Sequence, residues 1–243
     1  MQRNWQQNYS IMNEISIIPI KGLPEVKKGD DLATMTFDII NRSGNVIKDS
    51  DVFVITQKIV SKSEGMERDL NKYEFEDLIK SETKQIIRKR GDLIIAKTKH
   101  GFICANAGID KSNIEKNKAL LLPEDPNKSA HKFRNQIETA SGKKVAVVIS
   151  DTFGRAWRKG QVNFAIGSSG ISPITNYIGK YDSFNNELFA TEIATIDEIA
   201  SAAELVMEKS IDIPIAIIRG LKYESSNENA ELLIRDDQED FFL

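Results

Sequence analysis

The chain has 243 residues, 40% of them hydrophobic and 28% charged, so it can bury a sizeable core and has the composition of an ordinary globular protein. A formal net charge of −3 excludes the strongly basic surface typical of nucleic-acid-binding proteins. No apolar run reaches the length of a membrane span, the N-terminus lacks the apolar core of a signal peptide, and the single cysteine excludes an internal disulfide, so we expect a cytoplasmic protein.

The chain is expected to start with a tail and continue as one domain. Residues 1–14 form the predicted tail, and residues 15–243 form the domain, which could divide into two lobes. The β-branched run at 15–20 predicts a strand. The pattern over 29–44 predicts a helix, with Asp30 or Asp31 near its N-cap.

The next segments alternate between apolar runs and amphipathic runs. Residues 51–60 are rich in β-forming residues, and 61–65 close this run as a loop or a helix start. Residues 74–91 predict one helix that ends in basic residues and a glycine. Residues 92–110 predict two strands joined at His100 and the glycine after it, followed by a loop of small residues.

The second half of the chain predicts a further series of helices and strands. Residues 127–142 read as a helix, 143–150 as a fully apolar strand, 163–174 as a strand with a glycine loop, and 213–221 as a last buried strand. The clearest helix covers 195–209, where Thr195 and Glu198 fit a capping box. Its apolar face is expected to contain Ile196, Ile199, Ala200, Ala203, Val206 and Met207. The fold class is therefore mixed α/β or α+β.

The sequence lacks the common catalytic and nucleotide-binding motifs. No P-loop, G-x-G-x-x-G or H-E-x-x-H pattern is present. The histidines, His100 and His131, are far apart, and His131 reads as a solvated surface residue. Cys104 lies in an apolar strand and reads as a small buried hydrophobe. The residues therefore give no support to a Ser-His-Asp or Cys-His site.

Two aspartates follow predicted strands. Asp151 and Thr152 come directly after the apolar run at 143–150, and Asp110 follows the run that ends at 108. Carboxylate and hydroxyl oxygens suit Mg²⁺ or Mn²⁺, which usually take one or two carboxylates together with phosphates and waters. Taken alone, each aspartate more often caps a turn or a helix, whereas two such positions in one chain, one of them leading into a cluster of cations, support a metal site about as well as capping.

Cationic and amide side chains accompany these acids. A cluster of cations after Asp151 could be a solvated face, or could recognise phosphate or carboxylate through paired N–H donors. The polar residues near the end of the run at 51–60 and the Gly/Pro loop at 21–31 could line the same pocket. The side chains concerned are Arg155, Arg158, Lys159, Gln57, Lys58, Ser61 and Lys62.

Several blocks of the chain resemble coenzyme F420-0:L-glutamate ligases, the γ-glutamyl ligases of deazaflavin coenzyme biosynthesis. The resemblance runs from about residue 15 to residue 221, and its most specific blocks are AGIDKSN (107–113) and SDTFGRAWRKGQ (150–161). Further blocks are GLPEVKKGDDL (22–32), ITQKIVSKSEG (55–65), LLLPEDPNKSA (120–130), TEIATIDEIASAAELVM (191–207) and IPIAIIRG (213–220).

The resemblance implies a GTP-dependent ligase that joins L-glutamate to a lactyl-phospho-deazaflavin and adds a further γ-linked glutamate. It implies Mg²⁺ or Mn²⁺, often with K⁺, and an intertwined homodimer with a fold of its own that is neither P-loop nor ATP-grasp. The implied metal ligands are Asp110, Asp151 and Thr152, and Arg155 and Arg158 join the two aspartates as expected catalytic residues. The implied nucleotide contacts are Leu23, Pro24, Glu25, Val26, Gln57, Lys58, Lys62 and Asn113.

The chain departs from the family pattern in two places. Residues 208–212 contain no glycine where the family has a glycine-bearing segment that contacts nucleotide and sometimes metal. Asn185 and Asn186 stand where the family favours a glycine and an arginine. Asparagine tolerates left-handed backbone, so the turn can persist, but an arginine contact to substrate would be lost.

Two alternatives stay open at this point. One is a ligase of the same fold that acts on another carboxylate. The other is a nucleotide-binding regulatory protein without turnover, which the retained metal-type residues Asp110, Asp151 and Thr152 disfavour. The mechanism expected for the glutamate ligase that the resemblance implies is an acyl phosphate, because a carboxylate is a poor electrophile towards an amine.

Overall fold

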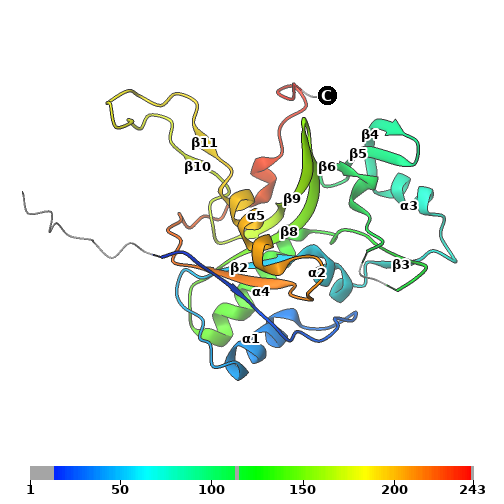
Figure 1. The fold of residues 1–243 in the computed structure, drawn as a ribbon, viewed down its shortest axis with the longest axis horizontal. Helices are drawn as coiled ribbons and strands as arrows, with labels where there is room; N and C mark the ends of the chain where they lie inside the picture. The colour runs from blue at the N-terminus through cyan, green and yellow to red at the C-terminus, as the bar shows by residue number, and fades with distance from the viewer. Residues whose placement is uncertain (1–13, 113–114, 242–243) are drawn as a thin grey trace, which may run out of the picture.

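A mixed five-stranded sheet forms the centre of the computed structural model, which describes residues 14–112 and 115–241 (Figure 1). The β2–β8 pair is parallel, and the other neighbouring pairs in this sheet are antiparallel. The strand order is β1 (Ser16–Pro19), β12 (Ile215–Arg219), β2 (Val52–Thr56), β8 (Ala146–Arg155) and β9 (Arg158–Ser169). The predicted mixed class is confirmed.

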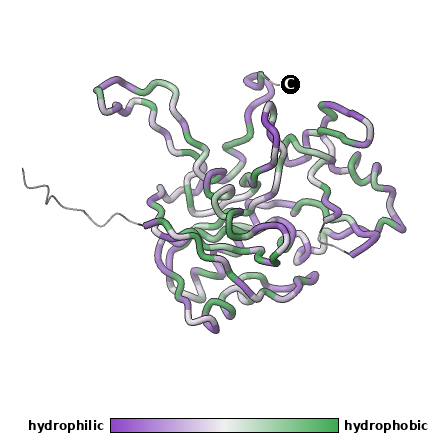
Figure 2. The backbone as a smooth tube through the Cα atoms, in the orientation of Figure 1, coloured by the Kyte–Doolittle hydropathy of each residue, from purple (hydrophilic) through white to green (hydrophobic). Residues whose placement is uncertain are grey.

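Alternate residues of the central strands face two different helical layers. In β2, Phe53 and Ile55 pack with α1 (Leu32–Arg42) and α4 (Pro126–Ser141). Val52 and Val54 pack on the opposite face with α5 (Thr195–Met207). This alternation follows from the two-residue period of a strand. Figure 2 shows the resulting concentration of hydrophobic backbone positions in the central strands.

Helices α1 and α4 each start at an aspartate and end near a glycine. Asp31 caps α1, accepting hydrogen bonds from the amides of Ala33 and Thr34, as expected for one of the two predicted positions. Asp125 caps α4, and Gly142 ends it in the left-handed conformation at φ +68°. The predicted helix boundaries are therefore close to the observed ones.

Helix α5 buries the predicted apolar face but lacks the predicted capping box. Its N-cap is Ala194, which has no side-chain cap hydrogen bond, and Thr195 is already the first helical residue. The Thr195 hydroxyl instead lies 2.6 Å from the Thr175 hydroxyl. The hydroxyl is engaged by a neighbouring segment, so the capping prediction is wrong while the helix prediction is correct.

Two further predictions are corrected. The β-rich run at 51–60 splits into β2 and the helix α2 (Gln57–Glu64), which Gly65 ends at φ +73°. The predicted helix at 74–91 splits into α3 (Phe75–Glu82) and the strand β4 (Thr83–Arg90). β4 pairs along its length with β5 (Leu93–Thr98), and this cross-strand pairing overrides the helical pattern.

A second, smaller cluster of elements lies beside the central sheet (Figure 1, right). β4, β5 and β6 (Ile103–Ala105) form a three-stranded antiparallel sheet, and β3 (Glu67–Asp69) pairs with β7 (Lys118–Leu120). β5 and β6 are the two strands expected on either side of His100. Leu78 and Ile79 of α3 pack against buried residues of β5, β7 and the 3-10 helix η1 (Asn106–Gly108).

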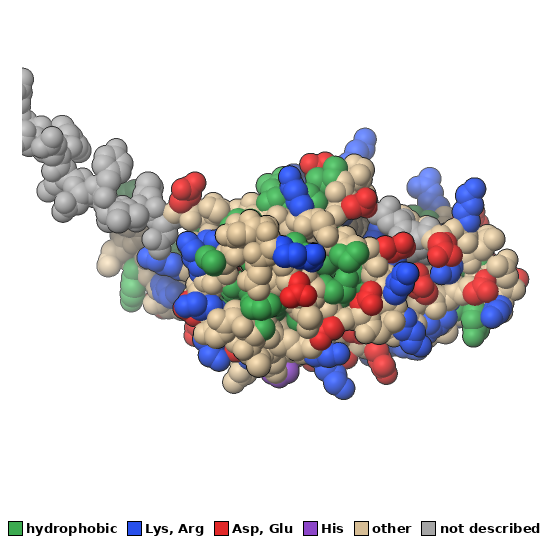
Figure 3. Space-filling model, turned by 90° about the horizontal axis from the view of Figure 1, so that it is seen from below, with side chains coloured by type: hydrophobic (Ala, Val, Ile, Leu, Met, Phe, Trp, Pro, Cys, Tyr) green, Lys and Arg blue, Asp and Glu red, His purple; other side chains and the backbone are tan. Residues whose placement is uncertain are grey.

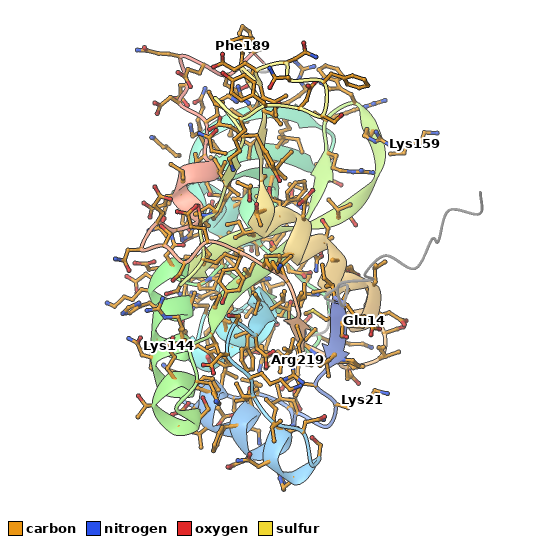
Figure 4. The ribbon with its side chains drawn as sticks, turned by 90° about the vertical axis from the view of Figure 1, so that its left-hand side faces the viewer. Glu14, Lys21, Lys144, Lys159, Phe189 and Arg219 are labelled. Atoms are coloured by element: carbon orange, nitrogen blue, oxygen red, sulfur yellow. The ribbon has the colours of Figure 1, made fainter. Side chains whose placement is uncertain are left out.

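Two hairpins extend from the body. β8 continues five residues beyond the predicted end at Ser150 and turns directly into β9, so Asp151 lies within a strand and not at its exit. The second hairpin joins β10 (Thr175–Asn176) to β11 (Glu192–Ile193) and projects away from the sheet (Figure 1, upper left). Figure 4 shows Lys159 of the β8–β9 hairpin and Phe189 of the β10–β11 hairpin at the end of the molecule remote from Lys144.

The C-terminal part adds the 3-10 helix η2 (Ala230–Leu233) against the sheet. Figure 3 shows acidic and basic side chains interspersed over one face of the molecule. Within the described residues, no helix is both long and apolar enough to cross a membrane. The predicted tail lies almost wholly outside the described residues.

Candidate functional site

A cavity of about 850 Å³ lies where the central sheet meets the smaller cluster. The loop between β1 and α1 lines it together with four segments that are far apart in the sequence. These segments are α2, the η1 loop, the β8–β9 hairpin and the turn after α5. It gathers most of the residues expected from the sequence. These are Leu23, Pro24, Glu25, Val26, Lys58, Lys62, Asp110, Asp151 and Thr152.

Asp151 lies at the point where β8 loses its pairing with β2. The parallel pairing of β8 with β2 ends at Ser150 opposite Thr56, and from Asp151 onward β8 pairs only with β9. That edge of the strand is therefore not paired with another described strand at the point where the carboxylate joins the cavity lining. Burial, together with the nearby Asp110 carboxylate, raises the pKa of Asp151 to about 7.

Asp110 is fixed by its backbone and by a lysine. Its amide and carbonyl groups both bond to Leu120, at 3.0 and 2.8 Å. Its Oδ2 atom lies 2.9 Å from the Lys58 Nζ atom, and its Oδ1 atom accepts a 2.7 Å hydrogen bond from the Ser112 amide. Burial favours the neutral acid, but Lys58 and Ser112 outweigh it and lower the pKa of Asp110. Asp110 is therefore an anion held by a cation.

Thr152 belongs to a second polar cluster in the same cavity. Its hydroxyl donates to the Asn163 Oδ1 atom at 2.7 Å and accepts from the Lys209 Nζ atom at 2.6 Å. Lys209 also donates to Asn163 Oδ1 at 3.1 Å and lies 3.3 Å from Glu204 Oε1. Three oxygens from three different elements thus surround one ammonium group.

The first loop is joined to α2 by backbone and side-chain contacts. The Gly29 amide donates to the Ser63 carbonyl at 2.8 Å, and Gly29 adopts φ +92° there. The Lys62 Nζ atom lies 3.8 Å from Glu25 Oε1, and Val26 is buried. The loop therefore forms one wall of the cavity beside the two lysines of α2.

Some predicted residues lie elsewhere. Gln57 is fully buried and does not line the cavity; its Oε1 accepts from the Ser61 hydroxyl at 2.9 Å, and its Nε2 has no hydrogen-bond partner among the described residues. Arg155 and Arg158 flank the β8–β9 turn, roughly 13 Å or more along the strand from Asp151. Neither arginine lines the cavity. Asn113 lies outside the described residues.

The residues considered for nucleophilic chemistry have structural roles. Burial, with the Asp151 charge nearby, raises the pKa of the Cys104 thiol to about 12, so it stays protonated. His131 is exposed on α4, as expected. His100 stacks on Phe102 with ring centroids 5.9 Å apart and contacts the Glu124 carbonyl at 3.1 Å. The charged groups that line the cavity are carboxylates and lysine ammonium groups, and no histidine or cysteine is among the described lining residues.

The donors at the cavity suit one hard divalent cation. Asp110 and Asp151 both line the cavity, and the Asp110 charge adds to burial in raising the pKa of Asp151. Two carboxylates are the usual protein share of a Mg²⁺ site completed by phosphates and waters. Among the described residues, no group of three or more His, Cys, Asp or Glu side chains could hold a metal alone. The residues therefore fit a cation that is shared with a phosphate ligand.

Sequence reasoning missed the contribution of the turn after α5 and of β9. Glu208, Lys209, Asp212 and Asn163 all line the cavity. The only sequence signal for this contribution was the absence of glycine from residues 208–212. The backbone of this segment adopts positive φ at Glu208 (+47°) and Asp212 (+52°). The Lys209–Thr152 contact spans 57 residues of sequence, which no local pattern reveals.

Comparison with known proteins gives a consistent family assignment. The F420-0:Gamma-glutamyl ligase family matches residues 21–220. The chain is 40% identical to Coenzyme F420:L-glutamate ligase of Methanothermobacter thermautotrophicus (85% of this chain, 89% of the relative), and 42% identical to that of Methanocaldococcus jannaschii (81% and 86%). It is 36% identical to that of Archaeoglobus fulgidus, over 93% of this chain and 95% of the relative. The chain therefore belongs to the F420-0:gamma-glutamyl ligase family.

Proposed function

We propose that the chain is a GTP-dependent ligase that joins L-glutamate to the carboxylate of coenzyme F420-0 and then adds one further γ-linked glutamate. The observation that carries the proposal is the cavity that gathers the first loop, the α2 lysines and the two aspartates. The names of the three relatives, each a Coenzyme F420:L-glutamate ligase, support the acceptor and the amino acid.

The nucleotide lies along the wall formed by the first loop and α2. Lys58 and Lys62 are one helical turn apart on α2 and both face the cavity. An ammonium group suits phosphate oxygens as a compact charge. The exposed Glu25 carboxylate, 3.8 Å from Lys62, can give way to a phosphate without leaving a buried charge unpaired.

Asp110 and Asp151 hold Mg²⁺ or Mn²⁺, and K⁺ supports the reaction. When bound, the divalent ion neutralises phosphate charge as a Lewis acid. Lys58 fixes the Asp110 carboxylate at 2.9 Å and leaves further lone pairs of that group available. Asp151 binds a cation in its ionised form, which its raised pKa makes sensitive to pH near neutrality.

The reaction proceeds in two displacements. An oxygen of the acceptor carboxylate attacks the γ-phosphorus of GTP, and GDP leaves, giving an acyl phosphate. The glutamate nitrogen then attacks the acyl carbon, loses a proton, and displaces inorganic phosphate. The protein contributes mainly position and positive charge, because phosphoryl transfer needs little covalent help. Lys58, Lys62 and Lys209 supply that charge.

The enzyme pairs as an intertwined homodimer through its hairpins. What supports this is the apolar surface on the β10–β11 hairpin, where Phe184 and Phe189 are 84% and 76% exposed, and at the β8–β9 turn, where Trp157 is 85% exposed. Large exposed apolar groups of this kind mark interaction surfaces. Light scattering on the double variant Phe184→Asp/Phe189→Asp should give a lower mass than the wild type; an unchanged mass rejects this surface.

The ligation assay tests the function. The purified protein is incubated with GTP, Mn²⁺, L-glutamate and the deazaflavin precursor, and the products are read by mass. One or two added glutamate masses are expected, with GDP formed in proportion. Product only with another carboxylate would favour a ligase of different specificity, and tight GTP binding with no product would favour the regulatory reading.

A further inference from the structure

The Lys209 ammonium group occupies a site built for a cation. Its Nζ atom lies 2.6 Å from Thr152 Oγ1, 3.1 Å from Asn163 Oδ1 and 3.3 Å from Glu204 Oε1. Asn163 is buried, and Glu204 is only 24% exposed, so the oxygens are held by the fold. A hydroxyl, an amide carbonyl and a carboxylate form a donor set that a metal ion could equally use.

A divalent ion cannot share this donor set with Lys209. An ion bound to Thr152 Oγ1 at a usual distance of about 2.1 Å would lie within about 5 Å of the ammonium on the same atom. Both are positive and repel each other at that separation, and the Glu204 carboxylate is already paired with the ammonium. The Thr152 hydroxyl is already engaged by two partners, because it donates its hydrogen to Asn163 and accepts from the ammonium.

The backbone around Lys209 is shaped to deliver this side chain. α5 ends at Met207, and the turn that follows passes through positive φ at Glu208 before returning to the sheet. Such a conformation is unfavourable for a residue with a side chain and persists where the surrounding structure requires it. Here it directs the residue after Glu208 back onto β8 and β9.

We infer that Lys209 is a built-in cation: it takes the position at Thr152 and Asn163 that a second divalent ion would need, so that each chain binds one divalent ion with its nucleotide, at Asp110 and Asp151. The inference rests on the proposed nucleotide and metal site. It also assigns Lys209 a positioning role, since the ammonium fixes the Thr152 hydroxyl at the cavity wall.

Counting bound Mn²⁺ tests the inference. The full chain is saturated with GDP, and free Mn²⁺ is measured by electron paramagnetic resonance against a GDP-only reference. We expect one ion per chain for the wild type and for Lys209→Arg, which keeps the charge. We expect two for Lys209→Ala, which frees the three oxygens. Lys209→Met, which keeps the length of the side chain without its charge, replaces the alanine variant if that variant does not fold.

A wild-type count of two, or an alanine-variant count that stays at one, overturns the inference. A purely structural role for Lys209 would change the melting temperature without changing the count. The measurement uses neither acceptor nor glutamate, so it is independent of the ligation assay. A contradictory count leaves the proposed ligase reaction standing, and a failed ligation leaves the count valid.

Discussion

The Nζ atom of Lys58 lies 2.9 Å from the Oδ2 atom of Asp110 and 2.6 Å from the Ser112 hydroxyl. Lys58 belongs to α2 on the central sheet, whereas Asp110 follows η1 in the smaller cluster. This ion pair therefore joins the two halves of the cavity. Lys62 lies one helical turn further along α2. The contact between Lys58 and Asp110 therefore also fixes the direction in which the Lys62 side chain leaves the helix.

Lys62→Ala should weaken GTP binding more than glutamate binding. The lost ammonium–phosphate hydrogen bond costs on the order of 1.5–3 kcal/mol, or roughly ten- to a hundredfold in affinity. Titration calorimetry measures both ligands. Lys21→Ala is the matched control, because Lys21 is an exposed lysine near the same loop that does not line the cavity (Figure 4). Equal GTP affinity in the two variants would contradict the assignment of Lys62 to the nucleotide site.

Asp151→Asn should abolish ligation while the protein stays folded. The amide lacks the negative charge that holds a hard divalent cation, but it keeps the size of the side chain. Circular dichroism checks the fold, and GDP release checks turnover. Asp197→Asn provides a control, since Asp197 is another half-buried aspartate with a raised pKa but lines the smaller cavity of about 280 Å³. Activity near wild type at saturating Mg²⁺ would reject Asp151 as a ligand.

The same variant has a predicted signature in stability against pH. Burial raises the pKa of Asp151 to about 7, above its value in the unfolded chain, so the folded state holds a proton that the unfolded state releases between about pH 4 and 7. Stability of the metal-free protein should therefore fall as pH rises through this window.

Asp151→Asn removes this loss and should be more stable than the wild type at pH 8, by on the order of 2 kcal/mol, but not at pH 4. Urea unfolding in the presence of a chelator measures the difference. Adding Mg²⁺ should stabilise the wild type more at pH 8 than at pH 5, because the cation binds the ionised carboxylate. A stability difference that does not depend on pH would contradict the assigned pKa.

The central sheet and α5 could be predicted because their patterns are strong and local. The β2 and β8 runs are apolar on both faces, as a parallel pair between two helical layers must be. The region at 74–91 was misread because β4 carries no buried face of its own. Its partner β5 determines its conformation, and a single-sequence pattern does not record that pairing.

The site was predicted unevenly for a similar reason. Asp110, Asp151 and Lys62 occur in recognisable blocks, and the fold brings them to one cavity. Arg155 was expected beside Asp151, but β8 remains extended past Ser150, and beyond Gly154 the strand no longer lines the cavity. Lys209 was not expected, because its position depends on a turn after α5 and on contacts to β8 and β9.

Glu208→Gly should stabilise the protein. Glu208 adopts φ 47° and ψ −176°, a region that glycine occupies without steric cost. Relief of this strain is worth about 1 kcal/mol after allowing for the greater freedom of glycine in the unfolded chain. Ser210→Gly is the control, since Ser210 lacks a positive φ and gains only unfolded-state entropy. If both variants lower the melting temperature equally, the turn is not strained at Glu208.

The order of the chemical steps can be read from oxygen labels. Lys58, Lys62 and Lys209 bring positive charge to the cavity, and the protonated, buried Cys104 leaves no thiolate for an acyl-enzyme. In the proposed mechanism the γ-phosphoryl group therefore goes to the acceptor carboxylate. With ¹⁸O in that carboxylate, one label should pass into inorganic phosphate for each amide formed, as mass spectrometry of the phosphate would detect.

Unlabelled acceptor in ¹⁸O water is the control and should give unlabelled phosphate, because attack by the amine at the acyl carbon expels the phosphate without water. Phosphate that carries no label from the acceptor would rule out the acyl-phosphate route, and GTP would then have to drive the reaction by another step.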